Sequence, residues 1–181
     1  MKVITAPEKY TVKDTDILVF LAGGITGCPD WQQEVIKYLQ EFDASPEECS
    51  LDDLVIFNPR REDFPINDPS AASTQISWEF QWLERADIFS MYFANSTSDQ
   101  PICMYELGRN IARMQMRFPT EWSHRIVISL EKGYKRENDV MIQTRLATNH
   151  SVRPIAFEQG TKFHAHRIYD AYVTLKYQKS L

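Results

Sequence analysis

Short apolar runs alternate with segments of helical periodicity along this chain, and no other feature limits its fold as strongly. A short continuous apolar run is typical of a strand buried on both faces of a parallel sheet. Such runs occupy 17–21, 54–57, 88–92, 126–130 and, with a weaker pattern, 152–157. Segments of helical character lie at 30–42, 75–85, 101–117 and 163–177. The alternation predicts an α/β fold, a three-layer Rossmann-like sandwich with a five-stranded, mostly parallel sheet.

The chain is predicted to form one domain. Its 181 residues contain no linker, internal repeat or low-complexity tract, so we expect a single domain over 1–181. The net charge of −5 argues against a nucleic acid polymer as partner. No apolar run approaches the ~20 residues that cross a bilayer, and 1–16 carries no export signal. Three widely spaced cysteines without a CxxC pair favour a reducing compartment. These features predict a cytoplasmic protein that acts on small molecules, away from membranes.

The ends of the expected strands indicate where a ligand binds. In an open parallel sheet, ligands bind beyond the carboxyl ends of the strands. Gly23 and Gly24 follow the first expected strand, 58–65 follows the second, and 92–99 follows the third. We therefore expect these segments to line one cleft. The paired glycines let a ligand approach the backbone closely, or they simply form a tight turn.

Two further groups near this cleft have both a binding and a structural interpretation. Arg60 and Arg61 could hold a phosphate or a base edge, or could pair with the acids that follow them. Trp78 and Trp82 lie one turn apart on an expected helix. Aromatic side chains spaced in this way more often fill a core or a subunit interface than stack on a ligand.

Glu106 is the carboxylate that this pattern favours for catalysis. The helix expected at 101–117 has an apolar stripe, formed by Cys103, Leu107, Ile111 and Met114. Glu106 lies one position off that stripe, about 100° around the axis, and so at the edge of the core near the cleft. A partly buried carboxylate beside other acids is what covalent glycosyl transfer requires. The alternative is an ordinary flank glutamate, with Asp99 as the helix cap.

The sequence contains no motif that indicates metal or cofactor binding. His164 and His166 diverge by about 200° on the last expected helix, and His124 and His150 have no partner at ligand spacing. There is no GxxxxGK[ST] phosphate loop and no GxSxG elbow. We therefore predict no metal and no cofactor.

Several short segments follow one another along the chain in a characteristic order. They are FLAGGI at 20–25 with Trp31, NPRR at 58–61, QI at 75–76 with Trp78 and Glu79, Leu83 with Ala86 and Asp87, and ELG at 106–108. Together they resemble the nucleoside 2-deoxyribosyltransferase family, which includes related nucleoside and nucleotide N-glycosidases. The resemblance spans about residues 17 to 110.

The resemblance implies a flavodoxin-like fold and a double-displacement reaction of nucleotide salvage. Glu106, in the ELG segment, would attack C1′ of 2-deoxyribose and form a covalent ester. Asp99 matches the acid that precedes the nucleophile, and Asp87 matches the acid that starts the third strand's loop system; these acids would handle the proton of the leaving base. The residues expected to contact substrate are Gly23, Gly24, Asn58, Arg60, Phe64, Trp78 and Asn138.

The resemblance also implies a homo-oligomer, built from dimers, whose sites are shared between subunits. Asn138 is the best match for the residue that a neighbouring subunit contributes, with Met141 nearby. One departure concerns the family's tyrosine at the end of the first strand, which aligns with Val19. Either Tyr92 or Tyr105 would then take its place, or the nucleophile would be held in a different way.

Three functions are consistent with these residues. The first is transfer of 2-deoxyribose between free nucleobases. The second is hydrolysis of a nucleoside or nucleotide by the same carboxylates, with water in place of the acceptor base. The third is a nucleotide-binding module without turnover. The preferred base, the choice between nucleoside and 5′-nucleotide, and the acceptance of ribose are left open by the sequence.

Overall fold

The computed structural model describes residues 1–45, 48–65 and 67–179. In this part of the chain six strands form one sheet in the order β1-β3-β2-β4-β5-β6, and every pairing is parallel. The strands are β1 (Lys2–Thr5), β2 (Ile17–Gly23), β3 (Leu54–Asn58), β4 (Ile88–Phe93), β5 (Ile126–Glu131) and β6 (Ile155–Phe157). The helices are α1 (Trp31–Asp43), α2 (Pro69–Arg85), α3 (Pro101–Arg117), α4 (Glu137–Ala147) and α5 (Gly160–Lys179), with a short 3₁₀ turn at Trp122–Arg125.

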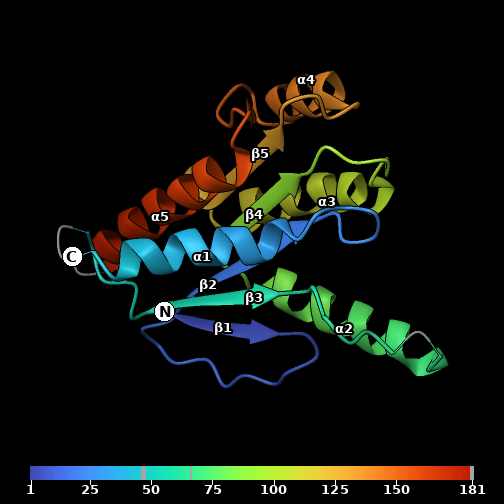
Figure 1. Cartoon of the computed structure of the whole chain (residues 1–181). Helices are drawn as coiled ribbons and strands as arrows, with labels where there is room; N and C mark the ends of the chain where they lie inside the picture. Colours follow the sequence, from blue (N-terminus) through green and yellow to red (C-terminus); the bar gives the residue numbers. More distant parts are fainter. Residues whose placement is uncertain (46–47, 66, 180–181) are drawn as a thin grey trace.

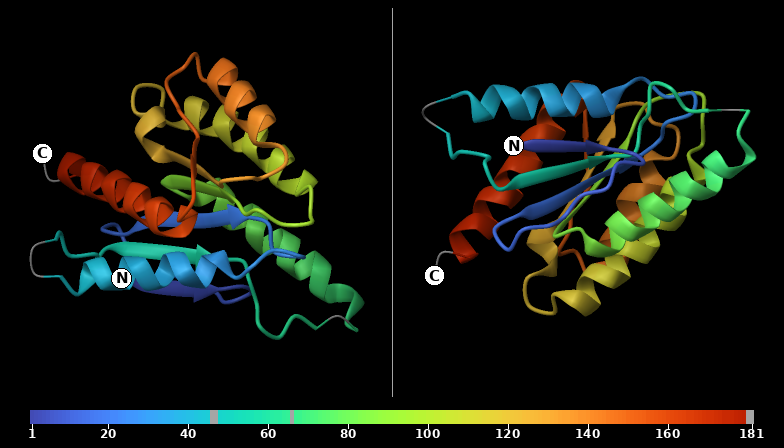
Figure 2. Two further views of the ribbon diagram at one scale, coloured as in Figure 1. Left: turned by 45° about the horizontal axis from the view of Figure 1, so that its top comes forward. Right: turned by 90° about the horizontal axis from the view of Figure 1, so that it is seen from below.

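The three-layer α/β class is confirmed. Helices α1 and α5 cover one face of the sheet, whereas α2, α3 and α4 cover the other (Figure 1). Seen from below, the sheet lies between α1 on one side and α2 and α3 on the other (Figure 2). With β1 set aside, the remaining strands follow the order 2-1-3-4-5, which is the flavodoxin-like arrangement.

The sheet has six strands, so the prediction of five was wrong. The additional strand, β1, pairs with β3 at the edge of the sheet. It is short, begins with Lys2 and is mostly only partly buried, so it lacks the continuous apolar run of a central strand. Helix α4 was also absent from the expected elements. Among its described residues only Val140 and Thr144 are buried, which leaves little periodic signal.

The central strands bury both faces, as their apolar runs predicted. Alternate residues of β2 enter two separate clusters: Phe20 faces α2 and α3, whereas Leu21 faces α1 and α5. On the α2 face, Phe57 stacks on Trp82 with ring centroids 3.9 Å apart. Trp78 and Trp82 are therefore core residues, and large aromatic side chains of this kind contribute much of a core's burial.

Helix α5 is attached to the sheet through a buried polar group. His164 lies between the hydroxyls of Ser90 and Ser129, at 2.7 and 2.9 Å from its two ring nitrogens. Burial lowers the pKa of His164 to about 3, so the ring is neutral in the folded protein. None of the described helices is both long and apolar enough to cross a membrane.

Candidate active site

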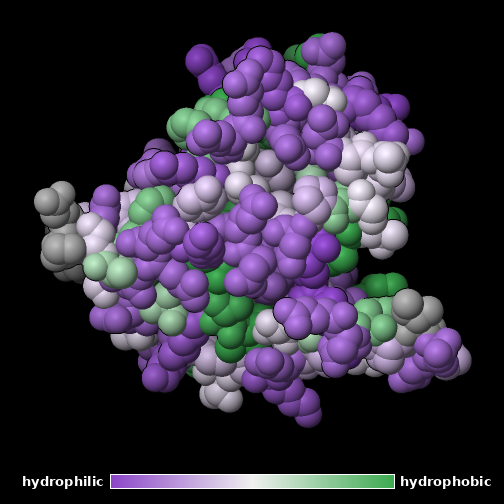
Figure 3. Space-filling model, viewed as in Figure 1, coloured by the Kyte–Doolittle hydropathy of each residue, from purple (hydrophilic) through white to green (hydrophobic). Residues whose placement is uncertain are grey.

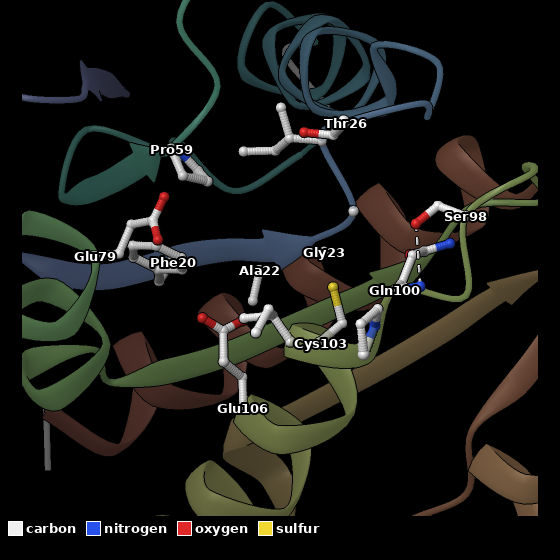
Figure 4. Close-up of a pocket in the computed structure, with 14 residues that line it drawn as sticks. Phe20, Ala22, Gly23, Thr26, Pro59, Glu79, Ser98, Gln100, Cys103 and Glu106 are labelled. Atoms are coloured by element: carbon white, nitrogen blue, oxygen red, sulfur yellow. Dashed lines mark hydrogen bonds between the residues drawn. The ribbon is translucent and has the colours of Figure 1, made fainter. Parts of the chain in front are cut away.

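A cavity of about 280 Å³ lies at the carboxyl ends of β2 and β4, on the face covered by α2 and α3 (Figure 4). The chain leaves β2 toward β3 on one side and returns to β4 on the other, so this is where the strand order reverses. Ligands of open α/β sheets bind at such a point. The cavity is lined by Phe20, Ala22, Gly23, Gly24, Ile25, Thr26, Pro59, Glu79, Ser98, Gln100, Pro101, Ile102, Cys103 and Glu106. Its volume lies near the lower end of the usual range for small-molecule sites, roughly 300–1,000 Å³.

The paired glycines line the cavity, and neither position has room for a side chain. A Cβ at Gly23 would lie 2.4 Å from the Tyr92 carbonyl and 2.5 Å from the Trp31 ring. A Cβ at Gly24 would lie 2.5 Å from the Cys28 sulfur. The indole N–H of Trp31 donates to the Gly24 carbonyl at 2.9 Å and stabilises the turn. Close packing therefore requires glycine at both positions, and both residues line the cavity.

Two carboxylates enter the cavity from different helices, Glu79 from α2 and Glu106 from α3 (Figure 4). Gln75, one turn before Glu79, donates from Nε2 to a Glu79 oxygen at 2.8 Å and to the Pro59 carbonyl at 2.7 Å. Gln75 therefore connects Glu79 to the loop that follows β3. Among the described residues, none forms a hydrogen bond with the Glu106 carboxylate, which leaves it available to a ligand.

The two carboxylates influence each other's ionisation. Burial and, to a smaller extent, the negative charge of Glu79 raise the pKa of Glu106, Arg109 acts in the opposite direction, and the resulting pKa is about 7. Burial also raises the pKa of Glu79, while its hydrogen bond from Gln75 acts in the opposite direction. Because like charges disfavour each other, the pair retains one proton to higher pH than an isolated glutamate does.

The opposite end of the cavity is polar but uncharged. Gln100 donates from Nε2 to the Ala94 carbonyl at 2.8 Å, and its backbone N–H donates to the Ser98 hydroxyl at 3.1 Å. Its Oε1 atom is buried and has no partner among the described residues. A buried acceptor without a donor is unfavourable, so this end of the cavity suits a ligand hydroxyl or amino group.

Neither of the other two predicted catalytic acids reaches the cavity. Asp99 is exposed and pairs with Lys135 at 2.7 Å, and Gln100 rather than Asp99 occupies the cap position of α3. Asp87 precedes β4 and therefore lies at the amino edge of the sheet, where it accepts from the Leu18 N–H at 3.0 Å. The expected cluster of three acids is thus replaced by the pair of Glu79 and Glu106.

Arg60 supports the cavity from outside. Its guanidinium donates to the carbonyls of Ile25 and Pro29, at 3.3 and 2.8 Å, and to the Gln32 side chain at 2.9 Å. It also pairs with Asp30 at 3.3 Å. These contacts hold the loop between β2 and α1, which forms one wall of the cavity.

None of the remaining predicted contact residues lines the cavity. Asn58 is buried and accepts from the Arg60 backbone N–H at 3.0 Å. Trp78 is a core residue whose indole donates to the Glu8 carbonyl at 2.7 Å. Phe64 is partly exposed beneath the guanidinium of Arg61. Asn138 is exposed at the start of α4.

The family's missing tyrosine has no replacement at the cavity in the described chain. Val19 is buried on the opposite face of the sheet. Tyr92 packs on that same face against Trp31, and the Tyr105 side chain is largely exposed. Phe20 is the aromatic residue of β2 that lines the cavity.

No group of three or more metal-ligating side chains occurs in the part of the chain that the structure describes. The Cys103 thiol lines the cavity, but burial and the nearby Glu106 charge raise its pKa to about 12. It is therefore protonated and a poor nucleophile. The chemistry available in this cavity is that of two coupled carboxyl groups.

Fold and cavity together define a flavodoxin-like protein with a paired-carboxylate pocket where its strand order reverses. A family described as nucleoside 2-deoxyribosyltransferase like matches residues 16–118, from the start of β2 to the end of α3. The match covers more than half of the chain and all the residues that line the cavity. The chain therefore belongs to this family, as the resemblance predicted. No curated protein matches it.

Sequence reasoning did not assign a role to Glu79 or Gln100. Glu79 was part of the resemblance, and its signal was its spacing of one turn from Gln75 on α2. Gln100 gave no signal, because its importance comes from its burial and from the Oε1 atom that lacks a donor.

Proposed function

We propose that this protein transfers 2-deoxyribose between nucleobases through a covalent ester with Glu106. The observation that carries the proposal is the placement of Glu79 and Glu106 in one small cavity, on two helices that face each other. A nucleophilic carboxylate and a second carboxyl group that handles the proton are the two groups that this displacement needs.

In the first half-reaction, the ionised Glu106 attacks C1′ of the sugar. The bond between C1′ and the base nitrogen breaks, its electron pair stays on the base, and a protonated Glu79 supplies a proton to that base. A base that accepts a hydrogen bond from Glu79 draws the shared proton to Glu79 and leaves the charge on Glu106. In the second half-reaction, an acceptor base attacks C1′, Glu79 takes its proton, and the ester bond breaks. Two displacements at C1′ retain its configuration.

The other end of the cavity supports a nucleoside rather than a 5′-nucleotide as substrate. The Oε1 atom of Gln100 is an acceptor, so it would pair with a sugar hydroxyl, whereas it would repel a phosphate oxygen. Arg60, the nearest candidate for phosphate binding, is occupied by the carbonyls of the β2–α1 loop.

Hydrolysis by the same carboxylates is the second candidate. A notch in the outline of the molecule, with hydrophobic side chains at its edges, separates the projecting part of α2 from the rest of the chain (Figure 3). A site that opens to solvent in the single chain would admit water as the acceptor. Transfer would then depend on a second subunit that closes the site, and we propose a homo-oligomer for this reason.

The proposal is tested by chromatography of a 2′-deoxynucleoside incubated with and without a second free base. We expect a new deoxynucleoside only when the second base is present. Equal release of free base under both conditions would instead establish the hydrolase. No reaction with any common deoxynucleoside or its 5′-monophosphate would contradict both candidates.

Variants at the two kinds of acid complete this test. Glu106→Ala should lower turnover by roughly a thousandfold or more while the protein stays folded. Asp99→Asn should keep turnover near that of the unmodified chain, because its carboxylate faces Lys135 and solvent. Equal losses in the two variants would contradict the assignment of Glu106.

A further inference from the structure

A second cavity, of about 390 Å³, lies on the opposite face of the sheet between α1 and α5. Its wall includes the first turns of α1, the ends of β4 and β5, and the start of α5. The lining residues are Pro29, Trp31, Glu34, Tyr38, Tyr92, Glu131, Glu158, Gln159, Gly160 and Thr161. It shares no lining residue with the cavity that holds Glu79 and Glu106. The proposed deoxyribosyl transfer therefore makes no use of it.

The hydroxyl of Tyr92 is a polar group on the wall of this second cavity. The side chain is 1% exposed and packs against Trp31 and His164. Its Oη atom reaches the wall formed by Gly160, where an added Cβ would lie 2.2 Å from it. No described residue forms a hydrogen bond with this hydroxyl. The hydroxyl lies on the wall of the cavity, so a group that enters the cavity from outside can form a hydrogen bond with it.

The charges around the hydroxyl determine what that group is. Glu34, Glu131 and Glu158 line the cavity, and none of its described lining residues is basic. Burial, followed by the charges of Glu131 and Glu34, raises the pKa of Tyr92 well above its ordinary value. The hydroxyl therefore stays neutral. Glu131 and Glu34 both contribute negative potential at its position.

The three carboxylates keep free acceptor capacity. Glu34 accepts from the Thr161 hydroxyl at 2.9 Å, and Glu131 accepts from the Asn95 backbone N–H at 2.8 Å. Glu158 pairs with Lys132 at 2.7 Å, and both of these side chains are mostly exposed. Each carboxylate has about four lone-pair sites, so one contact leaves most of them open.

The remaining surface is aromatic. Trp31, Tyr38 and Tyr92 line the same cavity as the carboxylates. Aromatic rings beside carboxylates are the usual environment for an organic ammonium group, because the ring faces and the acids both attract positive charge. A bare metal ion fits less well, since the described residues contain no cluster of three or more metal-ligating side chains.

We infer that this cavity is a binding site for a small alkylammonium ligand, with the ammonium between Glu34 and Glu131 and a contact to the Tyr92 hydroxyl. A second ammonium on a short alkyl chain would reach Glu158. Trp31 links this site to the first one, because its ring contacts Gly23 and its indole N–H donates to the Gly24 carbonyl.

Calorimetry with 1,4-diaminobutane as the probe tests this inference without any turnover. The unmodified chain should bind one equivalent saturably. Glu34→Gln and Glu131→Gln should each weaken binding roughly tenfold, the usual scale for loss of a charge-assisted hydrogen bond. Tyr92→Phe should weaken it several-fold without lowering the thermal midpoint, because its hydroxyl has no partner in the chain.

Two controls separate this site from general attraction and from the proposed active site. Glu41→Gln removes an exposed carboxylate of the same helix, α1, and should leave the affinity unchanged. Glu106→Ala should also bind the diamine like the unmodified chain, although it loses transfer. Absence of saturable binding would overturn the inference, and so would equal weakening by Glu41→Gln and Glu34→Gln. Either result leaves the proposed transfer untouched.

Discussion

At the scale of single residues, the ionisation of Glu106 is set by its surroundings. Burial and, to a smaller extent, the Glu79 charge raise the pKa of this carboxyl, which is about 7 with the opposing effect of Arg109 included. Only the ionised form attacks a sugar carbon, and its population falls as pH decreases through the pKa. We therefore expect kcat/KM, which reports the free enzyme, to fall as pH decreases below about 7.

Arg109 provides a direct test of this pH dependence. Its positive charge lowers the pKa of Glu106, so Arg109→Met should move the acidic limb of the kcat/KM profile to higher pH. Glu79→Gln should move it to lower pH in whatever turnover remains, because a negative neighbour is lost. Arg145→Met, an exposed change on α4, is the matched control and should leave the limb in place. If neither change moves the acidic limb of the kcat/KM profile, the limb reports the ionisation of a group other than Glu106.

We expect Asp87, unlike Glu106, to contribute to stability and not to turnover. Its carboxylate accepts from the Leu18 N–H at 3.0 Å and pairs with Arg117 at 3.6 Å, at the amino edge of the sheet. Asp87→Ala should lower the free energy of unfolding by about 1–3 kcal/mol, because the buried N–H loses its acceptor. Chemical denaturation measures this change. The folded fraction should keep its kcat, and a selective loss of kcat would instead support a catalytic Asp87.

At the scale of elements, the β2–α1 loop depends on one arginine for its shape. Arg60 contacts the carbonyls of Ile25 and Pro29, and a lysine cannot reproduce this planar set of donors. We expect Arg60→Lys to lower kcat/KM about tenfold, since small displacements of a cavity wall are costly in rate. Arg61→Lys is the control, because Arg61 pairs with Asp63, at 4.0 Å, and this change should leave kcat/KM in place.

The substrate dependence of the Arg60 effect distinguishes support from direct binding. If Arg60 only holds the loop, a 2′-deoxynucleoside and its 5′-monophosphate should lose kcat/KM by the same factor. A loss confined to the monophosphate would show that Arg60 contacts phosphate, and would contradict the supporting role.

Elements with a strong local pattern could be predicted from the sequence. Helix α3 has the predicted bounds, Pro101 to Arg117, because a clear apolar stripe coincides with a proline in its first turn. Asp30 accepts from the Gln33 N–H at 3.1 Å and caps α1, whose start lies close to that of the segment expected at 30–42. Edge strand β1 and helix α4 bury too few side chains to produce a comparable pattern.

The candidate site was less predictable because it depends on how elements meet. Glu79 is in the middle of α2, and Figure 1 shows that much of α2 projects past the ends of the strands. That projection brings Glu79 to the carboxyl edge, and the sequence has no signal for it. Asp87 could have been separated from the cleft, since a residue that precedes a parallel strand lies at the amino edge.

At the scale of the whole molecule, exposed apolar side chains lie on the two helices that carry Glu79 and Glu106. Ile76 and Phe80 on α2, and Ile102 and Tyr105 on α3, are each more than half exposed. Such a grouping commonly marks an interface. Helix α4 has a second apolar stripe.

This stripe on α4 consists of Ile142 and Leu146, both more than half exposed, and it continues the line of Asn138 at helical spacing. In a symmetric dimer, the same two surfaces of each subunit would meet, the α4 stripe of one against the α2–α3 surface of the other. Asn138 would then enter the partner's cavity, as the family resemblance predicts.

Disruption of this surface should separate the subunits. We expect Ile142→Asp combined with Leu146→Asp to convert a dimer into a monomer in analytical ultracentrifugation, and to abolish transfer. Gln143→Asp adds the same charge at an exposed neighbouring position of α4 and should preserve the dimer. A fully active monomer of the unmodified chain would contradict the shared site.

Mixing two inactive variants provides the most specific test of a shared site. Glu106→Ala destroys the nucleophile of its own subunit, whereas Asn138→Ala would impair the site of the neighbour. Random reassociation of equal amounts yields about half mixed dimers, and each mixed dimer has one intact site of two. The mixture should therefore recover about a quarter of the unmodified activity, although each variant alone is inactive. If Asn138 acts only within its own subunit, the mixture instead contains sites with one defect or the other, and no activity returns.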